Sequence, residues 1–199
     1  MTTTKQDSWL IVGLGWLGEA LSKHGLPTVT VRPGDLRYDD DLWLAIVTGG
    51  VVLDPASVIR EMDGLESRGV KIGSKLLLSD RAHVVFPWHI AEDKLLDGSL
   101  SGEAIGTTGR GIGPCYRDKV GRSLAIRLGD LYRDDFRKKL EHIVAVKRRL
   151  LAGWQQAGTP AAGADLDDLD AEAIYRQYMA YADRLRAHVA DTTAVLLDG

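Results

Sequence analysis

The sequence contains one cysteine, six prolines and no long apolar run among its 199 residues. A single thiol, Cys115, excludes an intrachain disulfide and a zinc site built on several thiolates. No stretch approaches the roughly 18–20 apolar residues that a membrane-spanning helix requires. Residues 1–8 are polar and lead into only a short apolar run, which does not resemble a signal peptide, so we expect a cytoplasmic protein.

An excess of charge of either sign is also absent. Lys and Arg total 25 against 28 Asp and Glu, which gives a net charge of −3. We therefore expect no nucleic-acid partner and, without an apolar span, no membrane partner. The longest basic cluster, Lys147–Arg149, lies in a helical pattern and is interpreted as a solvated face. Length and a hydrophobic content of 45% predict a single domain over 1–199.

Apolar runs and helical patterns alternate along the chain. The short runs that predict strands are 9–12, 42–47, 75–79 and 83–86. Asp54 followed by Pro55 predicts the start of a helix, and Gly69 suits its left-handed end. This alternation favours an α/β fold with a partial, mostly parallel sheet and flanking helices.

The last third of the chain has a helical pattern instead. Apolar residues at helical spacing predict helices over 134–156 and 169–189, joined by an Ala/Gly/Asp-rich linker at 158–168. Asp134 and Asp135 are placed in the first turn, where the helix dipole favours anions. The two helices predict a C-terminal helical hairpin beside the sheet.

Two glycine-rich segments compete as ligand sites. The first places Gly13, Gly15 and Gly18 after a predicted strand, a pattern that suits a dinucleotide pyrophosphate and hence an NAD(P)-binding oxidoreductase. Asp35 lies at the distance of the expected ribose contact, but it follows the Arg-Pro-Gly run 32–34. A tight turn between strand and helix is the other interpretation of these glycines.

The second segment, 105–114, contains four glycines within eight residues, together with Thr107, Thr108 and Arg110. Glycines allow the backbone to approach a ligand closely, and the hydroxyls and the guanidinium suit phosphate oxygens. No Gly-Lys-Ser/Thr follows, so the segment is not a nucleoside-triphosphate loop of the usual type. An anion or nucleotide site and a flexible surface loop both remain open from these residues.

The continuation of this segment resembles a known family. Gly111–Pro114 is followed by Tyr116, Lys119 and Arg122, at the spacing of the second signature of adenylosuccinate synthetase. Similar stretches occur in the same order elsewhere, at 50–55, 65–69, 79–84, 127–131 and 189–192. The resemblance covers 33–199 and leaves 1–32 divergent. It implies a synthetase core similar to that of P-loop NTPases.

The resemblance implies the reaction of IMP, aspartate and GTP to adenylosuccinate, GDP and phosphate, with Mg²⁺ bridging the phosphates. It places IMP at Thr108, Arg110, Lys119 and Arg122. Arg122 is expected to reach the IMP site of the other subunit in a homodimer. Cys115, inside the signature, is expected to be an inert small residue.

The N-terminal segment departs from the family pattern. Gly18 stands at the position of the general base, and Leu21 at that of the phosphate-binding lysine. The family's Gly-His-Thr segment is missing, and the sequence stops before the family's remaining substrate contacts. We therefore expect no catalytic residue in the degenerate loop and no activity of the chain alone. A non-catalytic IMP-binding or dimerising remnant is the alternative.

The histidines show no spacing typical of metal ligands. Surface or hydrogen-bonded core positions are expected for four of them, namely His83, His89, His142 and His188. No metal-binding residue is therefore predicted.

Overall fold

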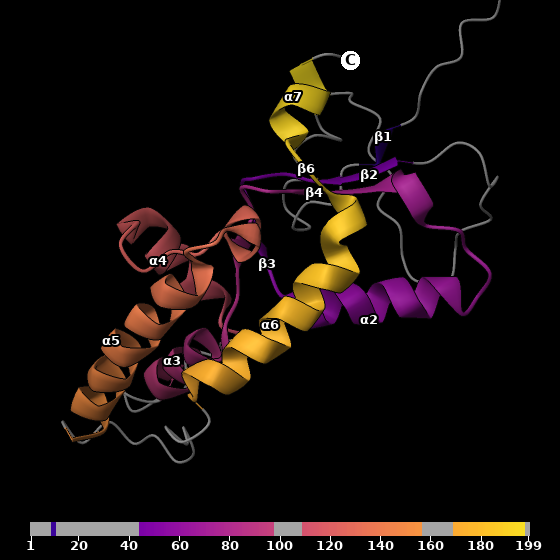
Figure 1. The fold of residues 1–199 in the computed structure, drawn as a ribbon. Helices are drawn as coiled ribbons and strands as arrows, with labels where there is room; N and C mark the ends of the chain where they lie inside the picture. The colour runs from indigo at the N-terminus through magenta and orange to yellow at the C-terminus, as the bar shows by residue number, and fades with distance from the viewer. Residues whose placement is uncertain (1–8, 11–43, 98–108, 157–168, 198–199) are drawn as a thin grey trace, which may run out of the picture.

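The computed structural model describes residues 9–10, 44–97, 109–156 and 169–197. Its main sheet is parallel throughout, with the strand order β1-β2-β4-β6 (Figure 1). These strands are β1 (Trp9–Leu10), β2 (Leu44–Val47), β4 (Leu76–Ser79) and β6 (Val189–Ala190). A second parallel pair joins β3 (Val52–Leu53) to β5 (His83–Val84). The predicted α/β fold with a mostly parallel sheet is confirmed.

Helices pack around and below the main sheet in the view of Figure 1. They are α2 (Pro55–Glu66), α3 (Pro87–Asp97), α4 (Ile112–Gly121), α5 (Phe136–Gln156), α6 (Ala171–Leu185) and α7 (Thr192–Leu197). Short 3₁₀ segments occupy Gly73–Lys75, Leu128–Tyr132 and Arg186–His188. None of the helices in the described ranges has the length and apolar character needed to cross a bilayer.

The predicted start of α2 is confirmed. The Asp54 carboxylate accepts a hydrogen bond from the Ala56 N–H at 3.2 Å, and Pro55 occupies the first helical position. Such a cap stabilises a helix by about 1 kcal/mol, and proline there removes no intrahelical hydrogen bond. After the helix, Gly69 adopts φ +85°, the left-handed conformation predicted for it.

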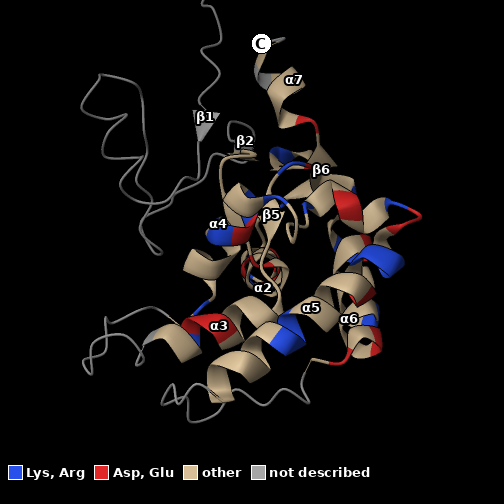
Figure 2. Cartoon of the chain, turned by 90° about the vertical axis from the view of Figure 1, so that its left-hand side faces the viewer, with Lys and Arg blue, Asp and Glu red and all other residues tan. Residues whose placement is uncertain are grey.

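The apolar faces of α5 and α6 are buried against each other and the rest of the core. Acidic and basic residues are interspersed on their outer sides (Figure 2). Phe86 lies at the centre, stacked on Trp88 and Tyr178 at centroid distances of 4.4 and 4.1 Å. Besides its expected partner α6, α5 also contacts α3, a helix that the sequence patterns had not indicated. Leu150, at helical spacing with the buried residues of α5, is exposed instead.

Several predicted boundaries were wrong. Asp134 and Asp135 precede α5 rather than forming its first turn, and α6 ends at Leu185. Val189 is not helical but pairs with Leu78 as part of the parallel sheet, because the chain returns through a 3₁₀ turn to the sheet edge. Lys75 belongs to a 3₁₀ turn before β4.

The basic cluster 147–149 was also wrongly interpreted as a uniformly solvated face. Arg148 and Arg149 are exposed, but Lys147 has an exposed fraction of 0%. Its position on α5 turns it toward α3 and α4, whose acidic side chains surround its ammonium group.

Candidate functional site

An open pocket of about 460 Å³ lies where the parallel strands end. The chain leaves β2 into Thr48, Gly49 and Gly50, leaves β4 into Arg81, and leaves β6 into Thr193, and all five residues line the pocket. Parallel strands bring their carboxyl ends to one edge of a sheet, which is where α/β proteins bind ligands. His83, Lys119 and Arg127 complete the lining.

The pocket is strongly basic. Its lining includes three cationic side chains, Arg81, Lys119 and Arg127, and no acidic one. Of these cations, Arg81 pairs with Asp191 at 3.8 Å, and both side chains are about half exposed, so the pair leaves most of the positive charge uncompensated. Two glycines and two threonine hydroxyls add small polar surfaces. This combination suits a phosphate or another compact anion.

Lys119 fixes one wall of the pocket. Its Nζ donates hydrogen bonds to the carbonyls of Gly49 at 2.9 Å and Gly50 at 2.6 Å. The Tyr116 hydroxyl approaches the same Gly50 carbonyl at 3.5 Å. Burial lowers the pKa of Lys119, and the neighbouring Arg127 charge adds to this. The lysine therefore ties the turn after β2 to α4 and presents its charge to the pocket.

His83 lies between the basic residues in an uncharged form. Burial, together with the charges of Lys119 and Arg127, lowers its pKa from 6.5 to about 4. Its Nδ1 atom is buried and has no hydrogen-bond partner among the described residues. The ring is buried and hydrogen-bonds to the Arg81 backbone, as expected of a core histidine, but its Nδ1 atom beside the basic pocket is left unsatisfied by the described residues.

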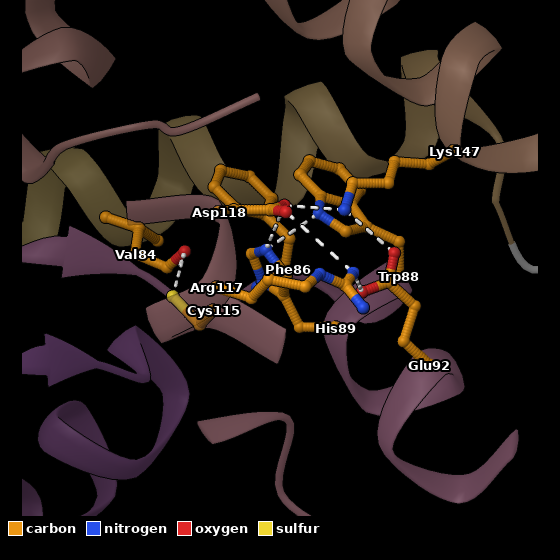
Figure 3. Close-up of polar contacts among 9 residues, drawn as sticks. All are labelled: Val84, Phe86, Trp88, His89, Glu92, Cys115, Arg117, Asp118 and Lys147. Carbon is orange, nitrogen blue, oxygen red and sulfur yellow. Dashed lines mark hydrogen bonds and ion pairs between the residues drawn. The ribbon is translucent and has the colours of Figure 1, made fainter. Parts of the chain in front are cut away.

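Behind the pocket, α4 is held by a buried ionic cluster of Glu92, Arg117, Asp118 and Lys147 (Figure 3). Lys147 Nζ lies 2.8 Å from Glu92 Oε1 and 2.6 Å from Asp118 Oδ2. Arg117, whose side chain is about half exposed, pairs with Glu92 from the outer side. Two positive and two negative groups balance, as burial of charge demands.

His89 borders this cluster as a neutral ring. The Phe86 N–H donates to its Nδ1 at 2.9 Å, and its Nε2 lies 3.0 Å from the Trp88 indole N–H donor and 3.1 Å from Asp118 Oδ2. Burial lowers the pKa of His89, although the Asp118 carboxylate opposes this. Burial acts in the opposite sense on Asp118, but hydrogen bonds from His89 and Lys147 prevail and hold its pKa below the usual value. His89 is thus the hydrogen-bonded core residue that was expected.

Comparison with known proteins assigns the chain to a family. The sequence profile of adenylosuccinate synthetase matches residues 37–198. The chain is 37% identical over 182 residues to adenylosuccinate synthetase of Caldanaerobacter subterraneus subsp. tengcongensis and 41% identical over 179 residues to that of Frankia alni. The chain belongs to the adenylosuccinate synthetase family. The matches cover 90% and 89% of this chain but only 40% and 38% of the two relatives.

A solved structure gives the same assignment. Adenylosuccinate synthetase from Plasmodium falciparum, in a fully ligated form, superposes with a TM-score of 0.64 at 27% identity. The superposition covers 79% of this chain and 34% of the Plasmodium chain. The predicted resemblance is therefore confirmed, and the alternative of an NAD(P)-binding oxidoreductase is not favoured. The glycines on which that alternative depends, Gly13, Gly15 and Gly18, lie outside the described residues.

The structure separates the residues that the family signature assigned to IMP. Lys119 lines the basic pocket, whereas Arg110 and Arg122 lie at opposite ends of α4 and are exposed. The ten residues of α4 span about 15 Å, so these two guanidinium groups start far apart within one chain. Arg122 ends the helix with φ +64°. Thr108 lies outside the described residues.

Seven pocket residues were not predicted as site residues: Thr48, Gly49, Gly50, Arg81, His83, Arg127 and Thr193. The available signal was positional and partial, since Thr48 to Gly50 and Arg81 directly or closely follow the predicted strands 42–47 and 75–79. Their convergence depends on the strand order, which no local pattern contains.

The described residues contain no group of side chains typical of a Mg²⁺ site. Within residues 44–97, 109–156 and 169–197, no three His, Cys, Asp or Glu side chains gather as metal ligands would. The degenerate loop that contains Gly18 and Leu21 lies outside the described residues. The described residues therefore offer a place for an anion but no metal site.

Proposed function

We propose that this chain serves purine nucleotide biosynthesis in the cytoplasm as an adenylosuccinate synthetase-type protein, and that its basic pocket takes the phosphate of IMP. The reaction joins IMP to aspartate with GTP, giving adenylosuccinate, GDP and phosphate. One observation supports the proposal most directly: in a member of this family, the signature lysine Lys119 lines a basic pocket at the carboxyl edge of the parallel sheet.

Arg81 and Arg127 supply the remaining charge for a phosphomonoester. Arginine can donate two parallel hydrogen bonds to phosphate oxygens, and the Gly49–Gly50 turn lets the backbone come close to the ligand. Lys119 has three ammonium protons, of which two point to the glycine carbonyls, so one remains for the anion. The neutral imidazole of His83 adds a hydrogen-bonding group without further charge.

Calorimetric titration with IMP and with inosine tests the phosphate assignment. We expect IMP to bind and inosine, which lacks the phosphate, to bind at least tenfold more weakly. A charge-assisted hydrogen bond is worth about 1.5–3 kcal/mol, so Lys119→Met should weaken IMP binding by roughly 10- to 100-fold. Lys138→Met, on the exposed side of α5, is the matched control and should leave binding unchanged. Equal binding of inosine and IMP would refute the assignment.

Turnover is a separate question from binding. Gly18 and Leu21 replace the family's general base and phosphate-binding lysine. Loss of a general base lowers rates by about 10²–10⁴-fold, so the 199-residue chain alone should show no measurable adenylosuccinate formation. The assay uses millimolar IMP, GTP, aspartate and Mg²⁺. Turnover near 1 s⁻¹, an ordinary enzymatic rate, would contradict this expectation.

Arg122 is proposed to act on the IMP site of a second copy in a homodimer. Its exposure at the end of α4, separated from Arg110 by a helix of about 15 Å, supports a role outside its own chain. Thr108→Val and Arg122→Leu should each weaken IMP binding, and co-refolding the two variants should restore one intact site per hybrid dimer. If hybrid dimers form but binding does not recover, Arg122 does not act across the interface.

A further inference from the structure

We propose that Lys147, which does not reach the pocket, is a positioning residue: through Asp118 it holds the neighbouring Lys119 at the pocket wall and thereby sets the affinity for a phosphate. The inference rests on the proposed function, because it concerns the same pocket. It extends that function to a residue on a different helix, α5, whose buried ammonium group contacts Asp118 of α4 (Figure 3).

Lys147 makes contacts that join three helices. It lies on α5, and its fully buried ammonium group pairs with Glu92 of α3 and with Asp118 of α4. A buried ion pair is weak evidence for stability, because desolvation offsets much of the attraction. Its directional contacts instead restrict the relative positions of the three helices, since a displacement of α4 would separate the Lys147 and Asp118 charges in a site shielded from solvent.

Contacts with α3 fix α4 along its whole length. At its N-terminal end, the Gly111 N–H donates a hydrogen bond to the Asp93 carboxylate at 2.9 Å. In its last turns, Asp118 accepts from His89, and Arg117 pairs with Glu92. Lys147 completes this set from α5, so α4 is tied to two helices at once.

Two consecutive residues of α4 connect the ionic cluster to the pocket. Asp118 and Lys119 are adjacent on α4, with Asp118 directed to Lys147 and Lys119 directed to the Gly49 and Gly50 carbonyls. Adjacent helical residues are separated by about 100° around the axis, so Asp118 can face Lys147 while Lys119 faces the Gly49–Gly50 turn. Rotation or displacement of α4 therefore moves the Lys119 ammonium group away from the pocket wall.

Three variants separate positioning from simple stabilisation. Lys147→Met removes the central charge, whereas Lys147→Met with Asp118→Asn removes one charge of each sign and leaves Glu92 paired with Arg117. The asparagine of the double variant retains a side-chain oxygen that can accept from His89. Lys139→Met is the control, because Lys139 also lies on α5 and pairs with a carboxylate, Asp130, at 2.7 Å.

Each variant is measured by urea unfolding, by calorimetric titration with IMP, and by the ¹H–¹⁵N signals of Gly49 and Gly50. We expect Lys147→Met to unfold at lower urea, to bind IMP about tenfold more weakly and to shift both glycine signals. The charge-balanced double variant should recover most of the stability but neither the affinity nor the signals. Lys139→Met should leave the affinity and the two signals unchanged.

Three results would overturn the inference. If affinity recovers together with stability in the double variant, Lys147 acts only on stability. If Lys139→Met alters affinity and the glycine signals as much as Lys147→Met does, the effect is not specific to the cluster. Failure of the wild-type chain to bind IMP would overturn the proposed function instead. The glycine signals then still decide the positioning role, which is refuted if they are unchanged in the double variant.

Discussion

Replacing Gly111 by alanine is expected to destabilise the protein more than the same change at Gly69 or Gly113. Gly111 precedes α4 with φ +75°, a conformation that residues with a side chain rarely adopt. A Cβ atom there would lie 2.8 Å from both the His89 carbonyl carbon and the Ile90 nitrogen. Both atoms are backbone of α3, so no side-chain rotation relieves the overlap.

The two other glycines isolate the two contributions. Gly69 has φ +85°, and a Cβ atom at this position would have no neighbour within 4 Å, so alanine there introduces only the conformational penalty of about 1–2 kcal/mol. Gly113 has neither feature and lies in the first turn of α4, where alanine should stabilise by about 0.5–1 kcal/mol. Insertion of a methyl group into a packed contact adds about 1–3 kcal/mol, so Gly111→Ala should lose about 2–5 kcal/mol in total.

Urea unfolding of the three variants measures these differences, provided that the dependence of the free energy on urea stays constant. We expect stability to fall in the order Gly113→Ala, wild type, Gly69→Ala and Gly111→Ala. If the free energies of unfolding of Gly111→Ala and Gly69→Ala agree within about 0.5 kcal/mol, the close contact between α3 and the N-terminal end of α4 does not exist as described.

Three further outcomes are expected. Tyr178→Phe should lose about 1–2 kcal/mol in urea unfolding, because its hydroxyl donates to the buried Val85 carbonyl at 2.7 Å; no loss would contradict that hydrogen bond. His83 takes up a proton near pH 6.5 in the unfolded chain but only near pH 4 in the native protein. The free energy of unfolding should therefore fall by up to about 3 kcal/mol as the pH drops from 6.5 toward 4. His83→Gln should flatten that decline, and an equally steep decline would refute the assignment. Burial raises the pKa of Cys115 to about 12, so Ellman's reagent should react with it in urea but not in native protein at about pH 8, and rapid reaction of the native protein would contradict its burial.

Local sequence signals determined much of the secondary structure. The Asp54-Pro55 pair specified the start of α2 through a side-chain hydrogen bond and a fixed φ, both of which act within a few residues. The apolar stripes of α5 and α6 likewise indicated which faces are buried. The signature 111–122 identified the family, because the order of its residues is itself sequence information.

Tertiary structure alone decided which residues meet. Lys147 resembles its neighbours Arg148 and Arg149 in the sequence, yet it is buried because α3 and α4 bring Glu92 and Asp118 to that face of α5. No periodicity contains that information, since the partners lie 55 and 29 residues away. The charge would be too costly to bury without them.

The basic pocket arises in the same way. Its residues come from the ends of β2, β4 and β6 and from α4, and they converge only because the strands run parallel in the order β1-β2-β4-β6. The sequence specified the chemistry of each residue, including the cationic Lys119 and the titratable His83. The fold decided that these residues lie together, where burial lowers the pKa values of both and the Arg127 charge adds to this.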